Sequence, residues 1–288
     1  FKNVFTYDEN YQVPNADIVK MKSYLTEIAK KLDMDVENLE ITDDSPDEET
    51  KKIITEKLEG DVPEGYFDVT RVFMEDKGIK VEVNTSLIAT VRFEPAVSLP
   101  DKYNFTDYAS YEDIVSVADY LRNKYLALID MENPKANVNG GDYNIYNQQN
   151  YSIDFFDESG EIIEQIINYN FNNVTFGYDD DGKLFIARIY RPDLSHKIGD
   201  YPIITANEAE KLLLKGNYIT TVPEEFPGGE YIRKIELIYR TGGTEKVYLP
   251  YYRIYVEIPT MKRNNGLNTY GAFYVPAVKA EYIENMPL

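Results

Sequence analysis

Residues 204–216, ITANEAEKLLLKG, precede three runs in which apolar and polar residues alternate: IRKIELIYRTG (232–242), VYLPYYRIYVEIP (247–259) and TYGAFYVPAV (269–278). In the first segment, Thr205 and Glu208 have the spacing of a capping box, which begins a helix, and Gly216 is a typical helix end. Alternation over eight or more residues is typical of strands with one face buried. The segment therefore predicts an amphipathic helix packed on an antiparallel sheet.

The order of one helix followed by three strands occurs about three times along the chain, over 16–93, 111–190 and 204–278. Apolar residues recur at helical spacing over 16–32 and again over 111–128, where Ser110 is a candidate cap. This order predicts an α+β fold in which amphipathic helices pack on curled antiparallel sheets.

The Asn- and Gly-rich segment 133–150, NPKANVNGGDYNIYNQQN, reads as a connection. We therefore expect two lobes, an N-terminal α+β domain over 1–135 and a C-terminal α+β domain over 136–288. Two elements stay open: 161–169, EIIEQIINY, fits a strand or a short helix, and Pro250 implies an edge strand or a bulge.

Composition limits the possible partners. The 288 residues include 50 acidic and 30 basic side chains, which give a net charge of −20, and 43% of residues are hydrophobic. Such a chain can bury a core, and its charge repels phosphate backbones and anionic lipid headgroups. We therefore expect no nucleic-acid partner and no electrostatic docking on a membrane.

Common catalytic and metal-binding motifs are missing. The chain has no cysteine and a single histidine, His196, so it cannot form a thiolate site or a histidine-based zinc motif. No glycine-rich phosphate-binding motif occurs, and the run 179–182, DDDG, lacks the calcium-loop spacing and fits a β-turn. We expect no cofactor and no metal.

Paired carboxylates are the catalytic option that remains, because glycoside hydrolysis needs two acidic groups. By context the candidates are Glu236 and Glu257, which interrupt aromatic strands. Alternation favours solvent-facing positions for both. The protein is therefore expected not to be an enzyme, with a carboxylate-dependent hydrolase of envelope polysaccharide as the alternative.

Tyrosine is the most unusual component, with 26 residues, several of them crowded near the C-terminal end. Aromatic and arginine side chains dominate binding hot spots, so a wet aromatic platform there could contact a protein or a glycan. Core packing is the alternative explanation. The candidate binding residues are Tyr251, Tyr252, Arg253, Tyr255, Tyr270 and Tyr274.

The layout of the last third, about 204–284, resembles the PepSY-like module of YycH/YycI-type regulatory proteins. The resemblance is carried by the "EAEKLL" helix turn, the "LPYYR" strand and the final "YVPAV" strand. It implies a non-enzymatic extracytoplasmic protein of Gram-positive bacteria that is membrane-tethered, by a lipid anchor or a helix, and regulates a two-component sensor kinase. It carries over no catalytic residues.

The expected function is the binding of a protein or cell-envelope ligand at the cell surface. The chain begins at Phe1 without a methionine, which we interpret as a form from which a leader or anchor has been removed. Residues 1–15 show no signal-peptide pattern. Inhibition of an extracellular peptidase is a further alternative.

Overall fold

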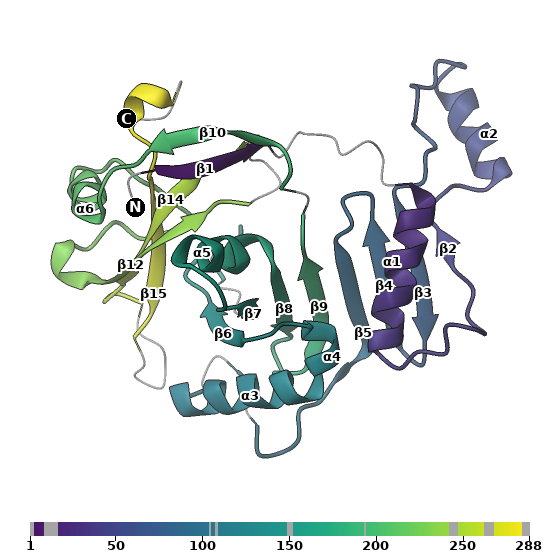
Figure 1. The fold of residues 1–288 in the computed structure, drawn as a ribbon, viewed down its shortest axis with the longest axis horizontal. Helices are drawn as coiled ribbons and strands as arrows, with labels where there is room; N and C mark the ends of the chain where they lie inside the picture. Colours follow the sequence, from purple (N-terminus) through teal and green to yellow (C-terminus); the bar gives the residue numbers. More distant parts are fainter. Residues whose placement is uncertain are drawn as a thin grey trace.

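A computed structural model describes residues 3–8, 17–103, 105–106, 109–148, 152–192, 194–241, 247–261 and 268–283. It has 27% helix and 34% strand, with antiparallel sheets, and confirms the α+β class. Figure 1 shows the larger sheet with α1 across β3 and β4, and the smaller sheets gathered near both chain ends.

The larger sheet has eight strands in the order β2-β3-β4-β5-β9-β8-β7-β6, all antiparallel to their neighbours. Their bounds are Thr42–Asp43 (β2), Arg71–Asp76 (β3), Ile79–Asn84 (β4), Ala89–Val97 (β5), Pro134–Asn139 (β6), Ser152–Asp157 (β7), Asn173–Tyr178 (β8) and Leu184–Tyr190 (β9). Alternation sends every second side chain to the face where the main core lies.

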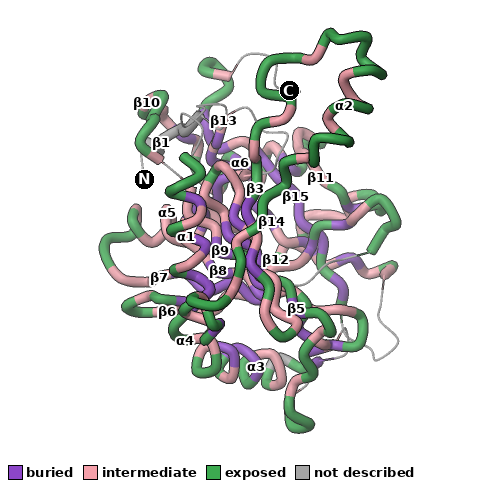
Figure 2. The backbone as a smooth tube through the Cα atoms, turned by 90° about the vertical axis from the view of Figure 1, so that its right-hand side faces the viewer, coloured by how far each residue is buried: buried purple, intermediate pink, exposed green. Residues whose placement is uncertain are grey.

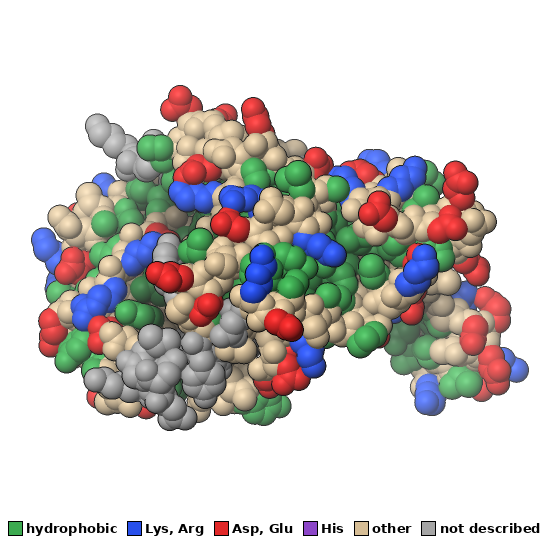
Figure 3. Space-filling model, turned by 90° about the horizontal axis from the view of Figure 1, so that it is seen from below, with side chains coloured by type: hydrophobic (Ala, Val, Ile, Leu, Met, Phe, Trp, Pro, Cys, Tyr) green, Lys and Arg blue, Asp and Glu red, His purple; other side chains and the backbone are tan. Residues whose placement is uncertain are grey.

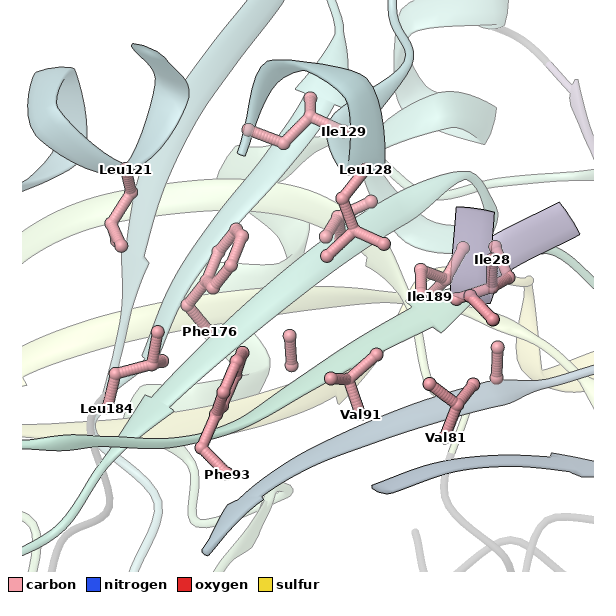
Figure 4. Close-up of a cluster of buried hydrophobic side chains, with 14 of the residues drawn as sticks. Ile28, Val81, Val91, Phe93, Leu121, Leu128, Ile129, Phe176, Leu184 and Ile189 are labelled. Carbon is pink, nitrogen blue, oxygen red and sulfur yellow. The ribbon is translucent and has the colours of Figure 1, made fainter. Parts of the chain in front are cut away.

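Three helices cover that face: α1 (Ile18–Lys31), α3 (Tyr111–Lys124) and α4 (Leu126–Ile129). In α1, Met21, Leu25 and Ile28 recur at helical spacing and are at most 1% exposed. In Figure 4, Leu121 of α3 and Leu128 of α4 meet side chains from several strands of the sheet. The apolar periodicity read from the sequence is therefore the packing surface of these helices.

Helix α5 (Ile162–Phe171) packs on the opposite face of the large sheet, against β7 and β8. Phe155 of β7 points into the main core, whereas the next residue, Phe156, makes an edge-to-face contact with Tyr169 of α5. The open alternative for residues 161–169 is thus decided in favour of a helix.

The second sheet has four strands in the order β11-β15-β14-β12. Their bounds are Ile219–Thr220 (β11), Ile232–Tyr239 (β12), Pro250–Glu257 (β14) and Tyr270–Pro276 (β15). Helix α6 (Ala206–Leu214) covers one face with Ala209 and Leu213, both fully buried. The predicted capping box of Thr205 and Glu208 begins this helix.

Pro250 does not mark an edge strand, because β14 is central. It is the first residue of β14, and its carbonyl accepts the Ala277 amide at 2.9 Å. A proline is compatible with the start of a strand.

A third sheet, of three strands, joins β10 (Lys197–Pro202), β1 (Asn3–Asp8) and β13 (Val247–Tyr248). We call the four-stranded sheet the small sheet. The segment after His196 is a strand that pairs with β1 at the beginning of the chain. The sequence also predicts a turn at Gly242–Gly243, between the runs 232–242 and 247–259, but these two residues lie outside the described residues.

The expected boundary near residue 135 falls inside β6, and the strands on both sides of it belong to one sheet because β5 pairs with β9. The buried side chains group differently, into a main cluster over residues 21–189 and a second one built mostly from residues 203–277. The division at 135 is therefore not a break between sheets.

Helix α2 (Glu48–Lys57) projects from the body and has no buried residue. In Figure 2 its tube is green and pink, whereas the strands at the centre are purple. Two short 3-10 helices complete the fold, η1 (Gly229–Tyr231) and η2 (Ala280–Tyr282). None of the helices in the described ranges combines the length and the apolar character needed to cross a bilayer.

Candidate ligand-binding groove

The predicted binding residues lie on the small sheet, but most of them are inside the protein. Of the six, only Tyr270 counts as exposed, at 39%, while Tyr251, Tyr252, Arg253 and Tyr274 are at most 8% exposed and Tyr255 is half-buried. Both faces of β14 are covered by other parts of the protein, so neither set of its alternating side chains faces solvent. The structure therefore corrects the expected exposed aromatic platform.

Tyr252 belongs to the face covered by α6. Its ring packs in the second core cluster and its hydroxyl donates to the Ile204 carbonyl at 2.8 Å. This residue is a structural link between β14 and the segment that leads into α6.

Tyr251, Arg253 and Tyr255 point to the other face, where Tyr274 of β15 lies opposite Arg253. The Arg253 guanidinium donates to Glu236 Oε1 at 2.7 Å through Nε. It also lies 5.2 Å from the centre of the Tyr255 ring. Burial alone would lower the pKa of Arg253, but the surrounding tyrosines and Glu236 raise it, so the side chain stays charged.

The same guanidinium connects the two sheets. Its Nη2 donates to the Tyr169 hydroxyl of α5 and to Asn139 Oδ1, the latter at 3.2 Å. Asn139 in turn donates through Nδ2 to Asp154 on β7. The chain of bonds Glu236–Arg253–Asn139–Asp154 therefore runs from the small sheet into the large one.

Asp154 is as deeply buried as Arg253, with 7% of its surface exposed. Burial raises its pKa to about 6, although hydrogen bonds from Thr175 and Ser152 and the charge of Arg253 act in the opposite direction. Its state of ionisation therefore changes close to neutral pH.

Residues 139–143, which we call the strap, cross the face of the small sheet. The Ala272 amide donates to the Gly141 carbonyl at 2.9 Å, and the Tyr274 hydroxyl donates to Asp142 Oδ2 at 2.6 Å. A Cβ on Gly141 would lie 3.0 Å from the Tyr255 ring, and its φ is +94°. Glycine is thus required both for the close approach and for the backbone conformation.

A groove of about 260 Å³ opens beside the network, between α5, β6 and β12. Lys135 ion-pairs with Glu158 at its rim, and Lys234 lies 2.7 Å from Glu236 Oε2. The residues that line it are Lys135, Ala136, Asn137, Phe156, Ile162, Gln165, Ile166, Tyr169, Lys234, Glu236 and Leu237. The groove is therefore apolar along α5 and polar on the strand side.

The backbone of β12 also faces the groove. This strand ends its sheet, and the Arg240 amide donates inward to the Leu249 carbonyl, whereas the Tyr239 amide donates outward to Asn170 Oδ1 of α5. In antiparallel pairs successive residues alternate between the two directions. The backbone groups of Ile235 and Leu237 therefore point to the outer edge, like that of Tyr239.

Glu236 and Glu257 do not form a catalytic pair. Glu236 lies opposite Arg253, four residues along β14 from Glu257, and four residues of strand span about 13 Å. Two carboxyls in a glycosidase lie roughly 5 to 10 Å apart. Each is also ion-paired with an arginine, Glu236 with Arg253 and Glu257 with Arg233.

Figure 3 shows acidic and basic side chains mixed over the face seen from below, so the acidic excess does not form one patch there. The described part of the chain contains no cluster of three or more His, Asp or Glu side chains suited to a metal ion. His196 is exposed and lies next to the start of β10.

Sequence reasoning missed Asp154, Tyr169 and Asn139, which complete the network around Arg253. One signal pointed to Asp154: it stands in SIDFFD (152–157) among apolar residues of a short strand, where an acid is unusual. Asn139 and Tyr169 had no comparable signal, because the first was read as part of a connection and the second as part of an ambiguous element.

No protein-family model and no curated protein matches the chain. Among solved structures, an uncharacterised protein from Eubacterium rectale ATCC 33656 is similar over 95% of this chain and 82% of that one, with 13% sequence identity and a TM-score of 0.43.

Proposed function

We propose that this protein is a non-enzymatic binding protein that takes an extended segment of another polypeptide along the outer edge of β12. One observation carries the proposal: the edge at which the backbone groups of Ile235 and Leu237 point outward is also a wall of the groove. A strand added to a sheet edge gains affinity from backbone hydrogen bonds and specificity from side-chain pockets.

The contacts of β12 also limit how far the added strand can extend. At Tyr239 the edge is already occupied by Asn170 Oδ1, at 2.9 Å from the amide. The accessible edge therefore runs from the β-bulge near Arg233 to Leu237. The groove, at about 260 Å³, is below the usual range of roughly 300 to 1,000 Å³ for small-molecule pockets and suits one side chain of the bound segment.

The setting of this activity is part of the same proposal. Because residues 204–284 resemble the YycH/YycI-type module, the proposed protein is extracytoplasmic and membrane-tethered and regulates a sensor kinase. Cell fractionation of the full-length gene product tests the location: recovery in the cytosol would contradict this setting.

Selection from a displayed library of random 12-residue peptides tests the binding. Gln165→Trp places a large ring in the groove, and Leu214→Trp, on an exposed position of α6, is the matched control. Peptides enriched on the wild type should bind the control and lose at least about tenfold in affinity to the Gln165 variant.

Strand addition also predicts a change in amide hydrogen exchange. On peptide binding, the amides of Ile235 and Leu237 should become protected from hydrogen exchange, because they gain backbone partners. Binding that leaves both amides unprotected would refute strand addition even if the peptide occupies the groove.

A further inference from the structure

Two of the polar side chains that line the groove, Lys135 and Lys234, can only donate hydrogen bonds. The N–H and O–H groups of Asn137, Gln165 and Tyr169 already donate within the protein, to Asn139, Tyr169 and the Gly160 carbonyl. The lining has one carboxylate, Glu236, which lies beside Lys234 on β12. A ligand group that only accepts hydrogen bonds therefore complements this surface better than one that donates.

The charges agree with the donors. Glu236 is already ion-paired with Arg253 and with Lys234, so its charge is compensated within the protein. With their ion-pair partners included, the charged groups at the groove are three positive (Lys135, Lys234 and Arg253) and two negative (Glu236 and Glu158), in a chain whose net charge is −20. The groove is thus locally cationic in an acidic protein, and its field selects against another basic group.

Both lysines can reach a ligand. Their side chains are 52% and 55% exposed, for Lys135 and Lys234, and sit at opposite walls on β6 and β12. Surface ion pairs such as Lys135–Glu158 are weak, so exchanging one carboxylate for another costs little. Between these walls lie the apolar side chains of Ile162, Ile166 and Phe156, against which the methylene groups of a ligand side chain can pack.

We propose that the groove recognises a carboxylate side chain of the bound segment, glutamate in preference to aspartate, held between Lys135 and Lys234 with its stem on α5. This inference rests on the proposed function and adds the chemistry of the partner. In this arrangement β12 binds the backbone of the partner, and the two lysines bind one acidic side chain of it.

The same peptide selection tests it, with synthetic peptides made from the enriched sequences. We expect an acidic residue at one fixed position, and Glu→Gln at that position should weaken binding to the wild type about tenfold. Lys135→Met with Lys234→Met keeps the stems but removes both charges, and should bind the Glu and Gln peptides equally. Lys211→Met on α6 removes a charge outside the groove and should keep the preference.

The outcomes separate the two proposals. Peptides that are blocked by Gln165→Trp but show no acidic position, or whose Glu preference survives in the double lysine variant, would overturn this inference and leave the proposed function standing. Peptides that bind equally well to the Gln165→Trp variant, or no enrichment at all, would overturn the proposed function and this inference with it.

Discussion

Replacing Asp154 with asparagine should change how the stability of this protein depends on pH. Asp154 is buried, and its pKa is raised from 3.8 to about 6. A raised acid pKa means that the folded state binds the proton more tightly than the unfolded chain does. The free energy of unfolding therefore falls as pH rises through this window, and the loss persists above about pH 6.

The shift of about two pKa units corresponds to about 3 kcal/mol. An asparagine at this position does not titrate, so the stability of Asp154→Asn minus that of the wild type should increase by about 2 to 3 kcal/mol between pH 4 and pH 7.5. Urea unfolding followed by circular dichroism at several pH values measures this difference, and subtracting the two proteins removes the contribution of the other carboxylates.

Asp157→Asn, on the same strand, is the control of opposite sign. Burial of Asp157 is outweighed by hydrogen bonds from Ser159, Glu132 and Asn133, which hold its pKa below the usual value. The stability of this variant relative to the wild type should therefore fall as pH rises towards the unfolded-state pKa of 3.8, and it should change little between pH 4 and 7.5. A difference between Asp154→Asn and wild type that stays constant from pH 4 to 7.5 would refute the reasoning about the buried carboxyl.

Three further variants test the packing around the site, each by urea unfolding. Gly141→Ala should cost about 2 to 4 kcal/mol, because its Cβ would meet the Tyr255 ring at 3.0 Å, whereas Gly216→Ala, which also has a positive φ but open space around it, should cost only about 1 to 2. Similar costs for both would show that the strap does not pack as described. Thr205→Ala removes the side-chain cap of α6 and should cost about 1 kcal/mol; no change would mean that the cap is not formed. Arg253→Met leaves Glu236 without its buried partner and should cost about 3 to 5 kcal/mol, and a loss below about 1 would contradict the network.

Local signals predicted the helices well. The periodicity of α1, the cap at Ser110 and the capping box at Thr205 involve residues three or four positions apart, and all are present in the structure. Such contacts form within one turn, so they can be read without knowing what the helix packs against.

Exposure of the candidate site could not be read in the same way. Alternation shows that β14 has two faces, but not that α6 covers one and that the strap and α5 cover the other. Residues Tyr251 and Tyr252 are buried on opposite sides by segments far away in the sequence. The tyrosines that suggested a surface platform are therefore mostly core, and the groove beside them is lined by residues of unremarkable sequence context.

The boundary expected near 135 falls inside strand β6 for a similar reason. Asn- and Gly-rich composition indicates a connection, and residues 140–148 do lie between two strands. These strands, β6 and β7, belong to the same sheet, and the first part of the Asn- and Gly-rich segment is β6 itself. Pairing of β5 with β9 leaves no local mark, because it joins residues on both sides of the expected boundary.

The pairing of β5 with β9 has a consequence during synthesis. Strand β5 ends at Val97, and its partner β9 begins at Leu184, almost ninety residues later. At roughly 5 to 20 residues per second, a ribosome needs about 4 to 17 s to supply the missing neighbour. Throughout that interval β5 is an open edge of the nascent half-sheet β2–β5. This edge exposes residues such as Val91 and Phe93, which are buried in the finished protein. The open edge of β5 is therefore the place where a chaperone would be needed and where aggregation would begin.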